Sequence, residues 1–200
     1  NNLHILNYSI PIHQWVTRSE LIEHIYTLPS LPHAIPYTTS YYQERWGFCL
    51  EHNRLAELRD AEYEVMIDAS LEEGHLTLGE GYLPGENPQE ILFSTYICHP
   101  SMANNELSGP LIQTFLYSYL LNREKPLQYS YRFLYVPETI GSIVYLSHFG
   151  DLLKQQVVAG YVITCAGDPG AFTYKKSKRG NTLADRAALN VLQHSGVSHR

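Results

Sequence analysis

Three side chains that can bind a metal or transfer a proton follow apolar, β-rich runs of the sequence, where buried strands would end. His99 follows EILFSTYIC, Glu138 follows YSYRFLYVP, and Asp168 follows VVAGYVITCAG. Because parallel strands present their carboxyl ends at one edge of a sheet, we expect these side chains to meet in one crevice. Zinc accepts imidazole and carboxylate ligands, so the three functional groups should lie within about 8 Å of one another around a metal-sized volume.

Each of the three residues also has a purely structural interpretation. His99 can simply end a strand before a proline. Glu138 precedes a helical stretch, where the helix dipole favours a carboxylate. Asp168 stands in Asp-Pro-Gly, which is typical of a turn. The functional hypothesis therefore depends on the coincidence of all three and not on any one of them.

The three apolar runs alternate with helical stretches, which is typical of an α/β domain. One helix of about four turns is predicted over LSGPLIQTFLYSYLLN, with Ser108 as its N-cap and Pro110 in its first turn. Further helical stretches are GSIVYLSHFGDLLKQ and the segment from Thr182 to His194. From about residue 84 onward we predict a mainly parallel sheet with the three runs as neighbouring central strands.

The first part of the chain has a different pattern, with short strands and turns. LHILNYSIPI is predicted to be a strand, and TRSELIEHIYTL a helix that begins with a capping box of Thr17 and Glu20. RLAELR is a short helix, EYEVMIDASL a strand, and LEEGHLTLGEGYL a hairpin through Glu73 and Gly74. We therefore predict two domains: a small β-rich module over 1–82 and an α/β domain over 83–200.

Two further motifs have alternative interpretations. The aromatic residues Tyr41, Tyr42, Trp46 and Phe48 form either the core of the β-rich module or a lid over the crevice. The basic segment KKSKRG, which starts at Lys175, is either a solvated loop or a grip on a phosphate or an acidic sugar.

Composition excludes several classes of protein. The chain has 200 residues, of which 44% are hydrophobic, and a formal net charge of −6, which argues against a nucleic-acid groove because phosphates need a basic face. No apolar run is long enough for a membrane span, and no signal peptide opens the sequence. Three cysteines are too few for a disulfide framework, so we expect a cytoplasmic protein. The chain begins with Asn1 and stops at Arg200 just after a helical stretch, and we expect it to be a piece of a longer protein.

The combination of CHPSMANNELSGP with FLYVPETIGS resembles the co-catalytic zinc aminopeptidases. More closely, the whole chain looks like the aminopeptidase-like proteins associated with polysaccharide biosynthesis, in which a small β-rich domain interrupts the peptidase domain. The motifs that carry this resemblance are LNYSIP, TSYY, WGFC and GDPGAFTYKKSKRG. Together they extend over essentially all 200 residues.

This resemblance implies a zinc-aminopeptidase type of α/β fold, incomplete in this chain, and a set of site residues. His99 matches the first metal ligand, Asn105 stands where the family has its bridging aspartate, and Glu106 follows directly. Glu138 matches the catalytic glutamate, and Asp168 is a looser match to a later metal ligand. A neutral Asn is a poor bridge between two dications, so Glu106 replaces it as a ligand or the second metal is absent. The family's final metal histidine lies beyond Arg200.

The resemblance implies a zinc-dependent hydrolase, with one or two ions in the complete protein and a peptide or small amide as substrate. Two alternatives remain open: a non-catalytic relative that binds a metabolite or a partner, and a single-metal amidohydrolase that acts on an N-acyl sugar. No nucleic-acid or membrane partner is expected, and self-association is left open. We expect the chain alone to bind zinc poorly, to show no peptidase activity and to expose an unfinished sheet edge.

Overall fold

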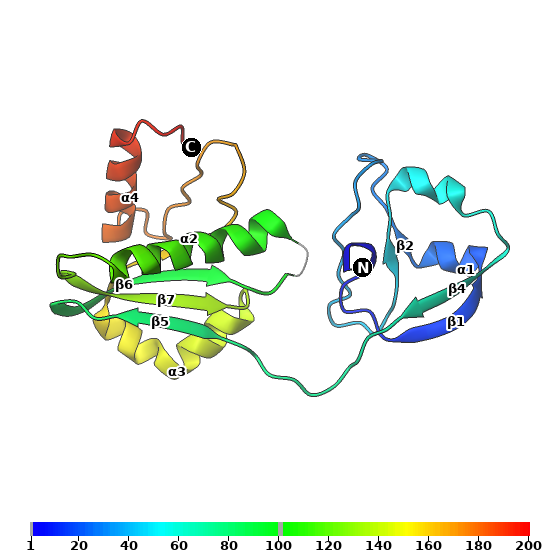
Figure 1. Cartoon of the computed structure of the whole chain (residues 1–200), viewed down its shortest axis with the longest axis horizontal. Helices are drawn as coiled ribbons and strands as arrows, with labels where there is room; N and C mark the ends of the chain where they lie inside the picture. The colour runs from blue at the N-terminus through cyan, green and yellow to red at the C-terminus, as the bar shows by residue number, and fades with distance from the viewer. Residues whose placement is uncertain (1, 100–101) are drawn as a thin grey trace. The chain divides into compact units, whose positions relative to one another are not determined.

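The computed structural model describes residues 2–99 and 102–200, which form two compact units (Figure 1). The first unit spans residues 1–74 and the second spans residues 75–200. The division falls before the boundary expected at residue 82, because the segment after His75 contributes a strand to the sheet of the second unit.

The second unit contains a four-stranded mixed sheet in the order β5-β7-β6-β8. Its strands are β5 (Gly79–Leu83), β6 (Asn87–Tyr96), β7 (Tyr129–Val136) and β8 (Val157–Val162). β6 is parallel to both β7 and β8, whereas β5 is antiparallel to β7. The α/β class is thus confirmed. β8 lies at the edge of the sheet that the described residues form, and not among its central strands as predicted.

Helices cover both faces of this sheet. α2 (Ala103–Leu121) lies on one face and α3 (Ile140–Gln156) on the other (Figure 1). The side chains of successive residues in β7 point to opposite faces of the sheet, as in any β-strand. Phe133 packs in a cluster with Leu120 of α2, and Leu134 packs in a cluster with Tyr145 of α3. α4 (Leu183–His194) follows a long loop and confirms the helical stretch predicted there, and Thr182 is its N-cap.

α2 begins earlier than predicted, at Ala103 and not after Ser108. The backbone N–H of Glu106 already donates to the carbonyl of Met102, which starts the helix there. Ser108 therefore lies inside the helix, where its hydroxyl donates to the carbonyl of Asn104, and Pro110 is also an interior residue. This start places Glu106 in the first turn.

The first unit consists of two small sheets around one apolar cluster. β1 (Ile12–Thr17) pairs antiparallel with β4 (Glu62–Ile67), and β2 (Ile25–Tyr26) pairs parallel with β3 (Phe48–Cys49). The helical elements of this unit are η1 (Asn2–His4), α1 (Arg18–Glu23) and η2 (His52–Glu57). The cluster is built on five buried residues: Val16, Leu21, Trp46, Val65 and Ile67.

Three local predictions for this part of the chain were wrong. LHILNYSIPI forms a short 3-10 helix and isolated bridges, because Ile5 and Asn7 pair singly with Phe48 and Thr39. The helix from Thr17 ends at Glu23, although Thr17 caps it as expected. LEEGHLTLGEGYL forms no hairpin, because β5 pairs with β7.

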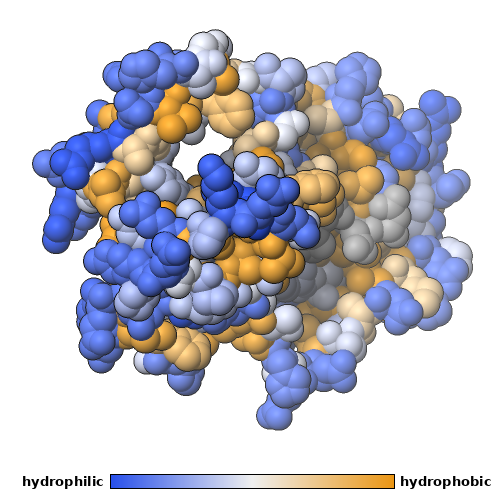
Figure 2. Space-filling view, turned by 60° about the vertical axis from the view of Figure 1, so that its left-hand side comes forward, coloured by the Kyte–Doolittle hydropathy of each residue, from blue (hydrophilic) through white to orange (hydrophobic). Residues whose placement is uncertain are grey.

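Apolar side chains reach the surface in several places (Figure 2). On α2, Leu107, Leu111 and Phe115 are each more than half exposed. Even so, no helix among the described residues is both long enough and apolar enough to cross a membrane.

Candidate metal centre

The candidate centre lies where β6 and β7 end and α2 begins. Cys98 and His99 follow β6, Glu106 is in the first turn of α2, and Glu138 follows β7. Because β6 and β7 are parallel, their carboxyl ends place these residues on the same edge of the sheet.

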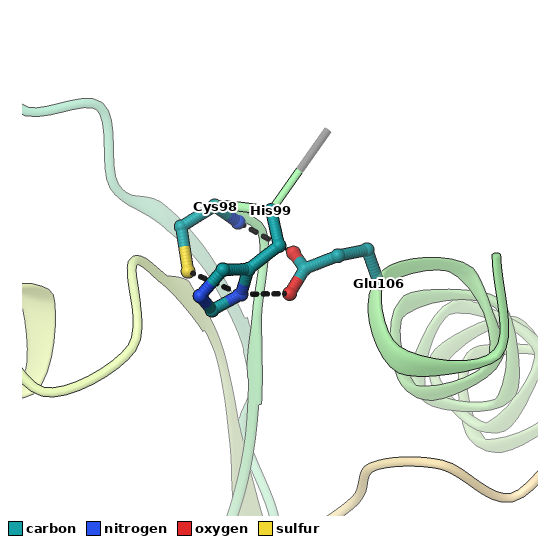
Figure 3. A group of neighbouring side chains, drawn as sticks. All are labelled: Cys98, His99 and Glu106. Atoms are coloured by element: carbon teal, nitrogen blue, oxygen red, sulfur yellow. Dashed lines mark hydrogen bonds and ion pairs between the residues drawn. The ribbon is translucent and has the colours of Figure 1, made fainter. Parts of the chain in front are cut away.

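Glu106 holds His99 through one ring nitrogen (Figure 3). His99 Nδ1 lies 2.7 Å from Glu106 Oε1, and the backbone N–H of Cys98 donates to Glu106 Oε2. Both carboxylate oxygens are therefore engaged, and Glu106 is buried. A carboxylate can only accept, so Nδ1 of a neutral His99 carries the proton and Nε2 keeps its lone pair.

Nε2 of His99 faces the second carboxylate of the centre, with Glu138 Oε2 3.6 Å away. Glu138 is half exposed, with 52% of its side-chain surface accessible. The imidazole thus lies between one buried carboxylate that fixes its orientation and one exposed carboxylate that can reach solvent.

Cys98 adds a sulfur to the same group. Its Sγ lies 3.3 Å from His99 Nδ1 and accepts a hydrogen bond from the backbone N–H of Glu138 at 3.1 Å. Cys98, His99 and Glu106 offer S, N and O atoms that all lie within 4.8 Å of one another, which suits a metal ion. Burial raises the pKa of the Cys98 thiol, and the charges of Glu106 and Glu138 add to this effect. A metal bound to this sulfur would have to displace its proton.

Asn105 points toward a different set of partners. Its Nδ2 lies 3.3 Å from the hydroxyl oxygen of Tyr96 and 3.4 Å from Cys165 Sγ. Among residues 2–99 and 102–200, the buried Oδ1 atom of Asn105 has no hydrogen-bond partner. Since a buried acceptor normally has a partner, this oxygen is suited to a cation or a water. Burial raises the pKa of Tyr96, so its phenol is a neutral donor and acceptor.

Asp168 is exposed and is held to the start of α2 by Asn104. Asn104 Nδ2 donates to Asp168 Oδ2 at 3.1 Å, and the backbone N–H of Gly170 donates to Oδ1 at 2.7 Å. Asn104 Oδ1 in turn accepts from the backbone N–H of Gly167 at 2.7 Å. Within residues 2–99 and 102–200, no ion pair or hydrogen bond joins Asp168 to His99, Glu106 or Glu138.

Two residues in the loops that follow β7 and β8 adopt unusual backbone conformations. Thr139, next to Glu138, has φ 61°, and Cys165, after β8, has φ 49°. Residues with a side chain rarely adopt positive φ, and such strain is often found at functional sites.

A pocket of about 580 Å³ lies against the centre. Cys98, His99 and Glu106 form its polar part, and the residues that form its apolar part are Ile97, Met102, Ala103, Leu107 and Pro110. The structure thus brings an imidazole and a carboxylate to the edge of an apolar pocket.

Sequence reasoning identified His99, Glu106 and Glu138, which the structure brings together, and Asn105 and Asp168, which have other partners. It missed Cys98, Tyr96 and Asn104. The position of Cys98 next to His99 was a usable signal, because the sulfur and the imidazole of neighbouring residues can reach one ion. Nothing in the sequence indicated that Asn104 holds Asp168.

Comparison with known proteins places this geometry in context. Residues 1–200 match a family described as a "Domain of unknown function (DUF4910)". A curated relative from Clostridium acetobutylicum is 49% identical over 199 residues and is named "Putative polysaccharide biosynthesis protein with aminopeptidase-like domain". A solved structure from the same species, described as a "putative peptidase", superposes with a TM-score of 0.94 at 48% identity.

Both relatives are about twice as long as this chain. All of the chain is covered in each case, but it accounts for only 45% of the curated relative and 46% of the solved chain. The chain thus spans about half the length of the relatives it matches.

Proposed function

We propose that this chain, which belongs to the DUF4910 family, supplies part of the centre of a zinc-dependent, aminopeptidase-like hydrolase. The observation that carries the proposal is the position of His99 between two carboxylates. Glu106 accepts from Nδ1, and Glu138 lies 3.6 Å from Nε2. The names of the two relatives, one with an aminopeptidase-like domain and one a "putative peptidase", support the same class of reaction.

The donor groups of the centre fit zinc. His99 would bind the ion through Nε2, and Glu106 would orient the ring, because a histidine ligand usually donates its other N–H to a carboxylate. This role differs from direct ligation by Glu106, which the sequence suggested. Asn105 Oδ1, buried and without a hydrogen-bond partner in the part of the chain that the structure describes, is a neutral oxygen donor near the same strand ends. Zinc, when bound, acidifies a water and polarises a carbonyl.

Glu138 is the group that would accept the proton of the attacking water and pass it to the leaving amine. Its carboxylate is half exposed, so that a water molecule can reach it. The pocket of about 580 Å³ beside His99 has an apolar part formed in part by Ile97, Met102 and Leu107. We therefore propose an apolar side chain as the substrate group that occupies this pocket.

A second candidate function is favoured by Asn105. The family resemblance places a bridging aspartate at this position, and a neutral amide balances two dications poorly. A single-metal amidohydrolase fits that observation. The words "polysaccharide biosynthesis" in the relative's name make an N-acyl sugar the alternative substrate.

Metal analysis of a polypeptide that contains these 200 residues and extends to the length of the relatives tests the proposal. We expect bound zinc in the wild type and a marked loss of zinc in His99→Ala. Glu138→Gln should keep the zinc and lose turnover of leucyl-nitroanilide, whereas Glu124→Gln, a change in an exposed loop, should keep both. Two ions per chain support the peptidase and one supports the amidohydrolase.

Substitution of the zinc by cobalt identifies the ligand atoms. A thiolate-to-cobalt charge-transfer band that disappears in Cys98→Ser would show that the ion lies among Cys98, His99 and Glu106. Absence of this band supports coordination through Nε2 of His99. If the extended protein binds no metal and cleaves no amide, the hydrolase proposal is wrong.

A further inference from the structure

A second pocket, with several polar and charged residues in its lining, lies beyond the carboxyl end of β8. It has a volume of about 390 Å³, and its lining includes Thr164, Cys165, Asp168, Thr173, Lys175 and Arg200. We call it the cationic pocket. Hydrogen bonds connect its wall to Asn105, because Thr164 Oγ1 donates to the Tyr96 hydroxyl, which also accepts from Asn105.

Two cations and one carboxylate line the cationic pocket. Asp168 already accepts from Asn104 and from the backbone N–H of Gly170, one bond on each oxygen. Arg200 uses Nε to donate to Thr173 Oγ1 at 3.0 Å. In the part of the chain that the structure describes, neither Lys175 nor Arg200 forms an ion pair.

The segment that carries Lys175 is fixed by a buried carboxylate. Asp185, fully buried in the first turn of α4, accepts from the Tyr174 hydroxyl, from the backbone and side chain of Ser177 and from the backbone and side chain of Thr182. These bonds hold the residues on both sides of Lys175 and Lys176. A fixed segment presents its charge with little loss of conformational entropy on binding.

Arg200 is held to the same segment by backbone pairing. Its N–H donates to the carbonyl of Phe172 at 2.8 Å, and its carbonyl accepts from the N–H of Tyr174 at 3.0 Å. The two cations of the cationic pocket therefore belong to adjacent, paired stretches of backbone.

The structure also divides the basic segment that the sequence singled out. Lys175 lines the cationic pocket, whereas Lys178 and Arg179 are exposed and line no pocket that we describe. All four basic residues of the segment are exposed, and Lys175 differs from Lys178 and Arg179 in lining the cationic pocket. Lys178 provides a matched control for Lys175, because both are exposed lysines of one short segment.

From these observations we infer that the cationic pocket binds an oxyanion, a carboxylate or a phosphate group, through Lys175 and Arg200. That this anion is part of the substrate rests on the proposed function. The substrate would then be an amide that carries an acidic group. Binding of the anion itself does not depend on that function, because the pocket is formed by other residues than His99 and Glu106.

Calorimetric titration of the metal-free chain, extended past Arg200 to the length of the relatives so that no terminal carboxylate lies in the pocket, tests the inference at low ionic strength. The probes are inorganic phosphate, glucuronate and, as the neutral control, glucose. We expect saturable binding of an anion and none of glucose. Lys175→Ala should weaken it about tenfold to a hundredfold, the loss expected for a charge-assisted hydrogen bond. Lys175→Arg should retain most of it, and Lys178→Ala should change it less than threefold. Preference for phosphate over glucuronate, or the reverse, identifies the source of the oxyanion.

Absence of saturable binding of either anion would overturn the inference, and so would an equal loss in Lys178→Ala and Lys175→Ala. His99→Ala serves to separate the two proposals. It should abolish zinc binding in the extended protein and leave anion binding by the metal-free chain unchanged. Loss of anion binding in this variant would place the anion at the candidate centre and contradict the cationic pocket.

Discussion

Glu106 determines which nitrogen of His99 is available for chemistry. A carboxylate 2.7 Å from Nδ1 requires a proton there, and the backbone N–H of Cys98 fixes the other oxygen of the same carboxylate. Glu106 therefore acts on His99 by positioning it. The pair differs from a nucleophilic triad, because Cys98 and Glu106 both lie against Nδ1 and not on opposite nitrogens.

The first prediction concerns the tautomer of the His99 ring. We expect the neutral ring to carry its proton on Nδ1 in the metal-free chain, because Glu106 accepts from that atom. Glu106→Gln should reduce this preference and give a mixture of the two tautomers, since an amide can donate as well as accept. The ¹⁵N chemical shifts of the ring at a pH where His99 is neutral measure both populations.

The control for this measurement is Glu124→Gln, which should leave the ring shifts of His99 unchanged. A neutral wild-type ring that is protonated mainly on Nε2 would contradict the assignment and would leave Nδ1 as the atom that binds a metal.

The sequence indicated His99 and Glu138 because residues that follow parallel strands share one edge of the sheet. Asp168 shows the limit of that reasoning. It also follows a strand, but in the loop after that strand the backbone N–H of Gly170 and the side chain of Asn104 donate to its carboxylate. Side-chain direction after a strand depends on the loop, and the pattern of the strand carries no information about it.

At the scale of elements, the packing of α2 against the sheet depends on Gly109. A Cβ atom at this position would lie 2.2 Å from Thr95 Oγ1 and 2.4 Å from the carbonyl oxygen of Ile163. The backbone of α2 therefore approaches β6 and the end of β8 as closely as it can. This approach positions Glu106, one turn earlier on the same helix.

Gly109→Ala should destabilise the second unit by about 1–3 kcal/mol, because the added methyl group forces α2 away from the sheet. Urea denaturation measures the free energy of unfolding. Gly150→Ala is the matched control in α3, where the added Cβ meets nothing within 4 Å. It should stabilise the chain by about 0.5–1 kcal/mol through helix propensity. Equal stability of Gly109→Ala and the wild type would show that α2 does not pack as described.

The helices and strands that follow one strong pattern were predicted well, namely β4, β6, β7, α3 and α4. The errors arose where a local sequence pattern was compatible with two different structures. GEGYL was assigned to a local hairpin, but its partner is β7, because tertiary pairing overrides local turn signals. Ser108 and Pro110 are typical of a helix start, but the helix starts earlier. Glu106 in its first turn bonds to Cys98 and His99. Asn104 accepts from the backbone N–H of Gly167, and these bonds stabilise the earlier start.

The loop before α4 provides a test of pH dependence. Hydrogen bonds from Ser177 and Thr182 hold the pKa of Asp185 far below its ordinary value. A group whose pKa is lower in the folded protein stabilises it above the unfolded pKa, near 4, and this contribution is lost as the pH falls below that value.

Asp185→Asn should therefore be less stable than the wild type at pH 7, and the difference should shrink steadily as the pH falls from about 4 toward 2. Urea denaturation across this range measures the difference in unfolding free energy. A difference that stays constant with pH would show that the carboxylate is not held as an anion in the folded protein.

For the molecule as a whole, the candidate metal centre formed by the described residues offers few charged side chains to a metal ion. His99, Glu106 and Glu138 lie together, but Asn105 is neutral, and Asp168 bonds to Asn104. The thiol of Cys98 holds its proton because burial raises its pKa. The chain also spans about half the length of its relatives.

We therefore expect the 200-residue chain alone to bind zinc in the micromolar range or more weakly and to show no turnover of aminoacyl-nitroanilides. A catalytic zinc site usually takes three protein ligands, and only His99 here combines a suitable atom, a fixed orientation and a neutral charge that costs little to bury. Zinc titration by calorimetry and a nitroanilide assay, run on this chain and on the extended protein, measure the difference. Submicromolar zinc binding or clear turnover by the chain alone would contradict the expectation. Such a result would mean that Cys98, His99 and Glu106 form a complete site of a different kind, in which the metal displaces the thiol proton and Glu106 becomes a ligand.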